Sequence, residues 1–268
     1  MKRAEIIAIG KEILRGQTQD TNSSWLAKRI TALGGMVERI VVPDDDVTAI
    51  VQEIKASFHN GSHIIITTGG LGPTFDDKTL AGIAEATGNP LALHSEALEI
   101  ITRRYNELWQ KGFVETPDIT PPREKMAILP EGAESLNNPV GTAPAVFLKT
   151  PHGVIFALPG VPKEMQAIFE QGVFPRLKEI LGAEVYLEEA VNSGMGDESV
   201  LGVLVEQVMK KVPGTYLKSK ATGFGQAVGL EVVITAAGSD KDEVRTRIEA
   251  AKRLLADLVK THPTRTGG

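Results

Sequence analysis

Continuous apolar runs alternate with apolar residues at helical spacing over the first 90 residues of the chain. Runs at residues 6–9, 36–42 and 63–67 predict strands, and the first and third are typical of strands buried on both faces. Between the strands, apolar side chains recur every three or four residues in the segments 25–33 and 47–58, which is typical of amphipathic helices. This alternation predicts a parallel sheet with right-handed crossovers and helices on both faces.

Polar residues before each helical segment indicate where the helices begin. Asn22 and Ser23 are candidate N-caps of the first helix, and the acidic run 44–46 is expected to hold at least one cap for the second. A third helix is expected to begin near Asp77 and to end at Gly88. Such caps satisfy backbone N–H groups that have no partner inside the helix.

The pattern after residue 90 predicts two longer helices and a hairpin. A helix is expected over 95–111, and two apolar strands flank the turn 151–153. Pro162 suits the first position of a helix that extends to about residue 181, with Pro175 as a kink or break.

The chain changes character after Gly182, where a small two-layer α+β domain is predicted. Its expected elements are, in order, a strand at 185–191, a helix at 198–211, strands at 215–217 and 229–236, and a helix at 242–260. The predicted domains are therefore residues 1–182 and 183–262, with a tail at 263–268.

Composition excludes several classes of protein. The 268 residues include no cysteine, which excludes disulfides, thiolate metal sites and cysteine nucleophiles. The formal net charge of -5 gives no sign of a nucleic-acid or membrane-surface protein. No stretch approaches the roughly 20 apolar residues that span a bilayer. The first apolar run is too short for a signal peptide, so a cytoplasmic location is expected.

The glycine-rich segment 69–77, with the sequence GGLGPTFDD, carries the strongest chemical signal. It follows a predicted buried strand and precedes a helix, and ligands of open parallel sheets bind at that edge. Its glycines let backbone N–H groups approach an anion, the helix adds its positive end, and Thr74 offers a hydroxyl to a phosphate oxygen. The segment matches neither the Walker motif nor GxGxxG. The alternative is a tight turn that needs glycine only for steric reasons.

Acidic residues cluster beside this segment. Asp76 and Asp77 could cap the next helix, or could recruit a hydrated Mg²⁺ or similar cation beside a phosphate. We expect one residue in each role, and the sequence does not select between them. Three aspartates at 44–46 exceed what one cap requires, which favours a metal or proton-transfer role for one of them. Glu12 follows the first strand and is either a solvent-facing residue or a site residue.

Two further loops are candidate walls of the same pocket. Residues 138–144 and 158–162 combine prolines, which fix φ, with glycines, which permit close approach. Rigid turns without a ligand are the alternative interpretation of both loops.

These motifs resemble the N-terminal region of the CinA family of competence/damage-inducible proteins. The matching segments are GKEILRGQTQDTN at 10–22, GGLGPTFDD at 69–77, NPVGTAP at 138–144 and LPGVPKEM at 158–165. In that family, a domain similar to molybdopterin-binding proteins precedes a small KH-like domain. The resemblance therefore implies a three-layer, mostly parallel α/β fold with a second, small α+β domain. The nicotinamide-nucleotide amidase domain of full-length members is expected to be absent here.

The resemblance also implies an enzyme, a metal-dependent pyrophosphatase that hydrolyses ADP-ribose or a related dinucleotide such as FAD. Its implied cofactor is a divalent metal (Mg²⁺, Mn²⁺ or Co²⁺), with a monovalent cation as an additional candidate. Asp44, Asp76 and Asp77 would bind the metal or polarise water. The residues expected to bind phosphate or ligand are Gly10, Glu12, Asn22, Gly69, Gly70, Leu71, Gly72, Thr74, Asn138, Gly141, Thr142, Pro159 and Gly160.

Two other functions would use some of the same features. A molybdopterin-binding or molybdopterin-adenylylating protein would share the phosphate site and need a pterin pocket. The KH-like region suggests RNA binding, but residues 183–268 contain 11 Lys and Arg against 12 Asp and Glu, without a convincing GXXG loop. We therefore expect a nucleotide partner rather than a nucleic acid or a membrane. A homodimer is expected, with the second domain serving packing or dimerisation.

Overall fold

The structure is a computed structural model that describes residues 2–182, 185–222 and 229–262. The chain divides into two compact units, with the change from the first to the second after Leu181. The tail predicted at 263–268 lies outside the described residues. Within the described ranges, no helix has both the length and the apolar character needed to cross a bilayer.

A six-stranded sheet forms the centre of the first unit, in the order β2-β1-β3-β8-β7-β6. These strands are β1 (Arg3–Ala8), β2 (Met36–Val41), β3 (Ile64–Thr68), β6 (Glu134–Leu136), β7 (Ala145–Thr150) and β8 (Gly153–Leu158). Neighbours among β2, β1, β3 and β8 are parallel, whereas β7 is antiparallel to both β8 and β6. The predicted mostly parallel sheet and the predicted hairpin are both confirmed.

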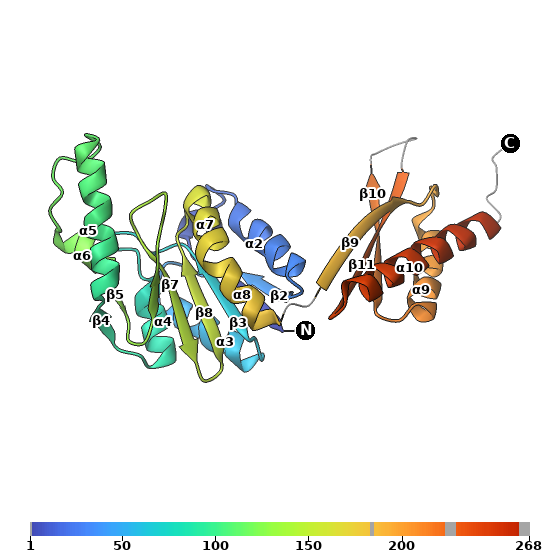
Figure 1. The fold of residues 1–268 in the computed structure, drawn as a ribbon, viewed down its shortest axis with the longest axis horizontal. Helices are drawn as coiled ribbons and strands as arrows, with labels where there is room; N and C mark the ends of the chain where they lie inside the picture. The colour runs from blue at the N-terminus through green and yellow to red at the C-terminus, as the bar shows by residue number, and fades with distance from the viewer. Residues whose placement is uncertain (1, 183–184, 223–228, 263–268) are drawn as a thin grey trace. The chain divides into compact units, whose positions relative to one another are not determined.

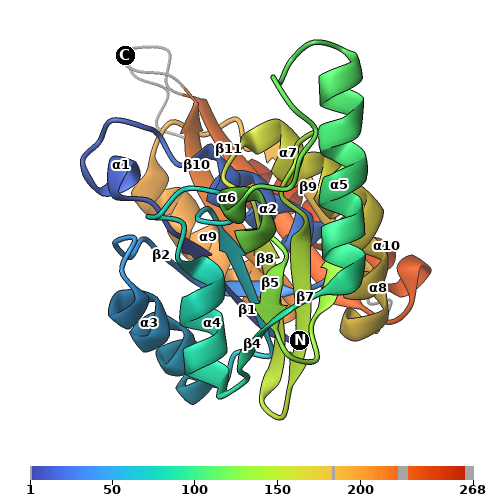
Figure 2. The same ribbon diagram turned by 90° about the vertical axis from the view of Figure 1, so that its left-hand side faces the viewer.

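Helices cover both faces of this sheet. The helices of this unit are α1 (Lys11–Leu14), α2 (Thr21–Ala32), α3 (Val47–His59), α4 (Thr79–Thr87), α5 (Ser95–Gln110), α6 (Pro121–Lys125), α7 (Pro162–Ile168) and α8 (Phe174–Leu181), of which α1 and α6 bury no residue. Helices α3 and α4 lie on one side of the sheet, and α2, α7 and α8 lie on the other (Figures 1 and 2). This arrangement gives the three layers that the sequence predicts.

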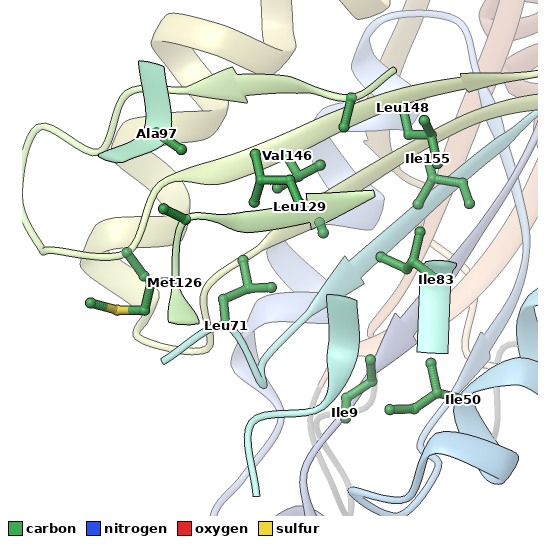
Figure 3. Close-up of a cluster of buried hydrophobic side chains, with 14 of the residues drawn as sticks. Ile9, Ile50, Leu71, Ile83, Ala97, Met126, Leu129, Val146, Leu148 and Ile155 are labelled. Carbon is green, nitrogen blue, oxygen red and sulfur yellow. The ribbon is translucent and has the colours of Figure 1, made fainter. Parts of the chain in front are cut away.

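Side chains of the central strands alternate between two buried faces. Ile7, Ile65 and Ile155 belong to a core that also contains apolar residues of α3, α4 and α5 (Figure 3). The adjacent residues Ile6 and Phe156 are also fully buried, and they point to the opposite face because successive strand residues alternate. Helices on both sides therefore explain why these strands are uninterrupted apolar runs.

The helix starts follow the sequence only in part. Asp46 caps α3, because its carboxylate accepts hydrogen bonds from the backbone N–H groups of Thr48 and Ala49. The expectation that Asn22 or Ser23 caps α2 is wrong. That helix begins at Thr21, and the carboxylate of Asp20 accepts from the backbone N–H of Ser23 at 2.9 Å. A cap is the residue whose side chain accepts a hydrogen bond from the backbone N–H groups of the first turn. Several neighbouring polar residues could do so, and the sequence pattern does not distinguish among them.

Some elements carry too little periodicity to be predicted. Strands β4 (Leu91–Leu93) and β5 (Ile128–Pro130) pair with each other in a separate antiparallel ribbon. A short π-helical segment, η1 (Phe169–Val173), joins α7 to α8 just before Pro175, where a kink or break is expected. Such a segment accommodates the missing proline N–H without ending the helical path.

The second unit is a two-layer α+β arrangement. It contains β9 (Val185–Asn192), α9 (Glu198–Lys211), β10 (Thr215–Thr222), β11 (Gly229–Gly238) and α10 (Lys241–Thr261). The three strands form an antiparallel sheet in the order β10-β11-β9, and both helices contribute to its apolar core. Strand β10 is longer than predicted. The KH-like assignment and the homodimer stay predictions.

A buried carboxylate links β1 to β2 and α3. Glu5 is 1% exposed and accepts hydrogen bonds from Arg39 Nε at 2.8 Å, Ser57 Oγ at 2.7 Å and Ser62 Oγ at 2.9 Å. Burial raises the pKa of Glu5, but the hydrogen bonds from Ser57, Arg39 and Ser62 outweigh burial and hold that pKa below its ordinary value. Arg39 also pairs with Glu53 at 3.0 Å, so one guanidinium group serves two carboxylates.

Glu5→Gln is expected to destabilise the protein in a pH-dependent way. Because the pKa of Glu5 is lowered by folding, its ionised form stabilises the protein above the ordinary value of 4.5. That contribution is lost as the pH falls through the lower folded-state pKa. The variant should lose about 1–3 kcal/mol of unfolding free energy at neutral pH, and this difference should shrink at more acidic pH. Urea unfolding of the wild type and the variant, at neutral pH and at a pH below 4.5, measures this difference in unfolding free energy.

The matched control is Glu38→Gln, because that carboxylate pairs with Arg3 at the surface at 3.7 Å. Its effect should be at most about 1 kcal/mol. A loss for Glu5→Gln that does not change with pH would contradict the assigned role of the ionised carboxylate.

Candidate functional site

A cavity of about 450 Å³ lies at the carboxyl ends of the parallel strands. Residues that follow β1, β2, β3 and β8 line it, together with residues that precede β7. Because β7 is antiparallel to β8, the start of β7 reaches the same edge as the ends of the parallel strands. The predicted site residues that line the cavity are Gly10, Glu12, Gly69, Gly70, Leu71, Gly72, Thr74, Asp76, Asp77, Thr142, Pro159 and Gly160.

Three backbone turns converge on Gly69. Its φ is +105°, and a Cβ atom there would lie 2.1 Å from the carbonyl oxygen of Ile9. Its N–H donates to the Leu158 carbonyl at 2.9 Å, which ties the turn after β3 to the end of β8. A Cβ on Gly160 would in turn lie 3.4 Å from the Cα of Gly69. Glycine is therefore required at this turn for steric reasons. This requirement is compatible with ligand binding, because the close approach of the backbone turns is also what forms the cavity.

The side chain of Leu71 does not face a ligand. It is 4% exposed and belongs to the same buried core as Ile9 and Ile83 (Figure 3). Leu71 therefore anchors the turn to the core, and only its backbone is available to the cavity.

The two aspartates of the turn are held by Thr74. The backbone N–H of Thr74 donates to Asp77 at 2.8 Å, and its Oγ1 lies 2.5 Å from a carboxylate oxygen of both Asp76 and Asp77. The hydrogen bond from Thr74 is the main cause that lowers the pKa of Asp76. Helix α4 begins at Thr79 without a side-chain cap, so the expectation that Asp76 or Asp77 caps it is wrong. Both carboxylates serve the turn instead.

Lys125 supports this turn from α6, and sequence patterns gave no signal for it. Its Nζ donates to the carbonyl oxygens of Gly72 at 3.3 Å and Asp77 at 2.7 Å, and also to that of Thr74. Burial lowers the pKa of Lys125, although the charges of Asp77 and Asp76 oppose that shift. Because an ammonium group has three N–H donors, these carbonyls use its whole donor capacity. Lys125 therefore fixes the backbone of the turn.

The acidic run after β2 divides into three roles. Asp46 caps α3, whereas Asp44 lies 3.1 Å from Lys11 Nζ, and this contact is the main cause that lowers the pKa of Asp44. Asp45 accepts from the backbone N–H of Lys11 at 2.8 Å and is the aspartate of this run that lines the cavity. Nothing in the sequence distinguishes Asp45 from Asp44. Glu12 also lines the cavity, which places it at the site rather than only in solvent.

Asn138 and Gly141 shape the cavity wall without lining the cavity. Asn138 is 4% exposed, and its Oδ1 accepts from the N–H groups of Val140 and Gly141 at 3.0 and 2.8 Å. Its Nδ2 donates to the Ala143 carbonyl at 2.9 Å and to Glu164 Oε2 at 2.7 Å. Glu164 lines the cavity from the first turn of α7, and the sequence motif in that segment did not single it out.

Asn22 lies behind the site and does not line the cavity. Its Nδ2 donates to Thr68 Oγ1 at 2.9 Å and to the Gly160 carbonyl at 2.8 Å. The Thr68 hydroxyl donates in turn to the Pro159 carbonyl at 3.1 Å. Asn22 thus connects α2 to the end of β3 and to the turn after β8.

The lining of the cavity is strongly acidic. Its carboxylates are Glu12, Asp45, Asp76, Asp77 and Glu164, and among the described residues no Lys, Arg or His lines it. An anionic ligand would therefore need an accompanying cation as well as backbone N–H donors.

The carboxylates of the cavity fit the implied divalent metal only if a ligand completes its coordination. Across residues 2–182, 185–222 and 229–262, no three His, Asp or Glu side chains come together in a group that could hold a metal ion. Mg²⁺ commonly binds through one or two carboxylates, substrate phosphates and water. The site therefore fits a cation shared with a phosphate ligand and does not fit an all-protein metal cage.

The chain matches known proteins along most of its length. A family described as "Probable molybdopterin binding domain" matches residues 5–179. A protein from Aeropyrum pernix is 40% identical over 254 residues, covering 94% of this chain and 91% of that protein. A protein from Pyrobaculum arsenaticum is 38% identical over 262 residues, covering 97% and 96%. The solved structure of the protein CinA, with unknown function, from Thermoplasma acidophilum is 34% identical, has a TM-score of 0.59, and covers 67% of this chain and 98% of that one.

Gly69→Ala is expected to destabilise the protein more than Gly88→Ala. Both residues have positive φ, +105° and +72°, but no atom lies within 4 Å of a Cβ built on Gly88. Gly88→Ala should therefore cost only about 1–2 kcal/mol for its left-handed backbone. Gly69→Ala should carry the same backbone cost and lose about 1–3 kcal/mol more of unfolding free energy because its Cβ would clash with the carbonyl of Ile9. Urea unfolding of both variants measures the difference, and equal losses would argue against the convergence of turns at Gly69.

Proposed function

Since the chain belongs to the family of probable molybdopterin-binding domains and is CinA-like, we propose that its cavity binds a phosphate-containing nucleotide and hydrolyses its pyrophosphate with a divalent cation. ADP-ribose, or a related dinucleotide such as FAD, is the proposed substrate. Water would add across the P–O–P bridge of ADP-ribose to give AMP and ribose 5-phosphate.

One observation carries this proposal. The cavity combines a glycine turn, where backbone N–H groups can approach an anion, with carboxylates from the ends of three neighbouring parallel strands and from α7. No basic side chain of the described residues lines it. Such a lining favours a phosphate and a cation together over either one alone.

Each part of the lining has a proposed role. Asp76 and Asp77 would hold the cation, which supplies neutralisation of phosphate charge and a more acidic bound water. The N–H groups of the turn 69–72 would bind phosphate oxygens. Asp45 or Glu12 would accept the proton of the attacking water. Asp44, which pairs with Lys11, would act on the site only through that lysine.

The purified protein is expected to release AMP from ADP-ribose or FAD in the presence of Mg²⁺, Mn²⁺ or Co²⁺, and to stop when EDTA removes the metal. The cation is needed because the carboxylates of the lining would otherwise repel the phosphates. Chromatographic separation of the products measures the reaction. No AMP from either substrate with any of the three metals would refute the hydrolase proposal.

Asp77→Asn is expected to lower kcat by at least about 100-fold without unfolding the protein. An asparagine can still accept the hydrogen bond that the Thr74 N–H donates to Asp77, so the turn keeps its shape while the charge is lost. Steady-state kinetics and thermal unfolding measure the two effects. The control is Asp46→Asn, which keeps the cap of α3 and should leave both properties unchanged. Full activity of Asp77→Asn would remove Asp77 from the mechanism.

A second candidate function is binding or adenylylation of molybdopterin, which the family description favours. It would use the same phosphate turn and place a pterin elsewhere in the cavity. Calorimetry with molybdopterin and with ADP-ribose separates the two functions. Tighter binding of molybdopterin together with no hydrolysis of dinucleotides would favour the second one.

A further inference from the structure

Glu164 is the cavity carboxylate to which the proposed reaction gives no role. It lies in the first turn of α7, after β8, whereas Asp76 and Asp77 come from the turn after β3. Within the described residues, the hydrogen bond from Asn138 is the interaction that its side chain makes. Most of its capacity to accept hydrogen bonds is therefore left for a ligand.

The neighbouring loop is built around this carboxylate. Asn138 is 4% exposed and donates from Nδ2 to Glu164 Oε2 at 2.7 Å, while its Oδ1 holds the backbone of Val140 and Gly141. A Cβ on Gly141 would lie 1.9 Å from the same carboxylate oxygen. The buried Asn138 thus holds one carboxylate oxygen of Glu164 beside the loop, and a side chain at position 141 would displace that carboxylate.

The carboxylate of Glu164 offers hydrogen-bond acceptors to a ligand. One of its oxygens already accepts from an amide N–H, and an ionised carboxylate has acceptors only. Phosphate oxygens are acceptors as well, so the part of a ligand that faces Glu164 has to donate hydrogen bonds.

We propose that Glu164 forms a hydroxyl-binding subsite, in which its carboxylate accepts hydrogen bonds from the vicinal diol of a ribose whose phosphate lies against the turn 69–72. This inference rests on the proposed nucleotide ligand. Carboxylates recognise ribose hydroxyls in the same way at the edges of other parallel sheets. Glu164 and the turn 69–72 line the same cavity of about 450 Å³, so one ligand can contact both. Glu164 is a specificity-determining residue that binds substrate without moving a proton.

The test is Glu164→Gln, because a glutamine can still accept from Asn138 and keep the loop in place. Its amide N–H₂ would then face the ligand as a donor where an acceptor is needed. Calorimetry with Mg²⁺ compares ADP-ribose, supplied as its non-cleavable α,β-methylene analogue with phosphate-like groups and ribose, with inorganic pyrophosphate, which has phosphates only. The variant should bind ADP-ribose about tenfold or more weakly and bind pyrophosphate as the wild type does. In turnover, KM for ADP-ribose should rise while kcat stays the same.

Glu170→Gln is the matched control, since that carboxylate pairs with Arg29 at 2.7 Å and does not line the cavity. It should bind both ligands normally. Equal weakening of both ligands by Glu164→Gln would show a merely structural role, and unchanged binding of both would also overturn the inference. The inference would also be overturned if the wild type bound pyrophosphate but not ADP-ribose. A wild type that binds ADP-ribose without cleaving it would refute only the hydrolysis, because the binding comparison does not depend on turnover.

Discussion

The close approach of three backbone turns at Gly69 is the constraint on which the rest of the site depends. The carbonyl of Ile9 occupies the space where a side chain at Gly69 would begin, and the Leu158 carbonyl accepts the N–H of Gly69. This contact joins the ends of β1, β3 and β8 into one edge. The glycine turn and Glu164 lie on segments that leave this edge, so backbone packing sets where these segments begin.

Carboxylates near the start of β1 and beyond its end differ in their partners. Near its start, the carboxylate of Glu5 is buried and receives hydrogen bonds from Arg39, Ser57 and Ser62. Beyond its end, Glu12 and other carboxylates line a cavity that no basic side chain of the described residues lines. A buried, fully paired carboxylate makes a fold depend on its partners, whereas carboxylates with unused acceptor capacity are suited to a ligand and a cation. The same strand therefore connects a structural cluster with a candidate functional one.

The interactions within the site divide into those that hold the turn and those left for a ligand. Lys125 uses its donors on the carbonyls of the glycine turn, and Thr74 bonds Asp76 and Asp77. Asn138 plays the matching part in the neighbouring loop, where it holds Glu164. Two rigid walls thus face one cavity, one suited to a phosphate with its cation and the other to groups that donate hydrogen bonds.

The sequence by itself determined the parallel sheet, the glycine turn, the two loops beside it and a helix cap within residues 44–46, because apolar periodicity, glycine, proline and capping are local properties. Only the tertiary structure decided that Asp45 rather than Asp44 lines the cavity, that Asp76 and Asp77 leave α4 uncapped, and that Asn22 lies behind the site. It also brought in Lys125 and Glu164, whose partners lie 48 and 26 residues away along the chain. Such contacts depend on which strands end beside one another, and no local pattern encodes that arrangement.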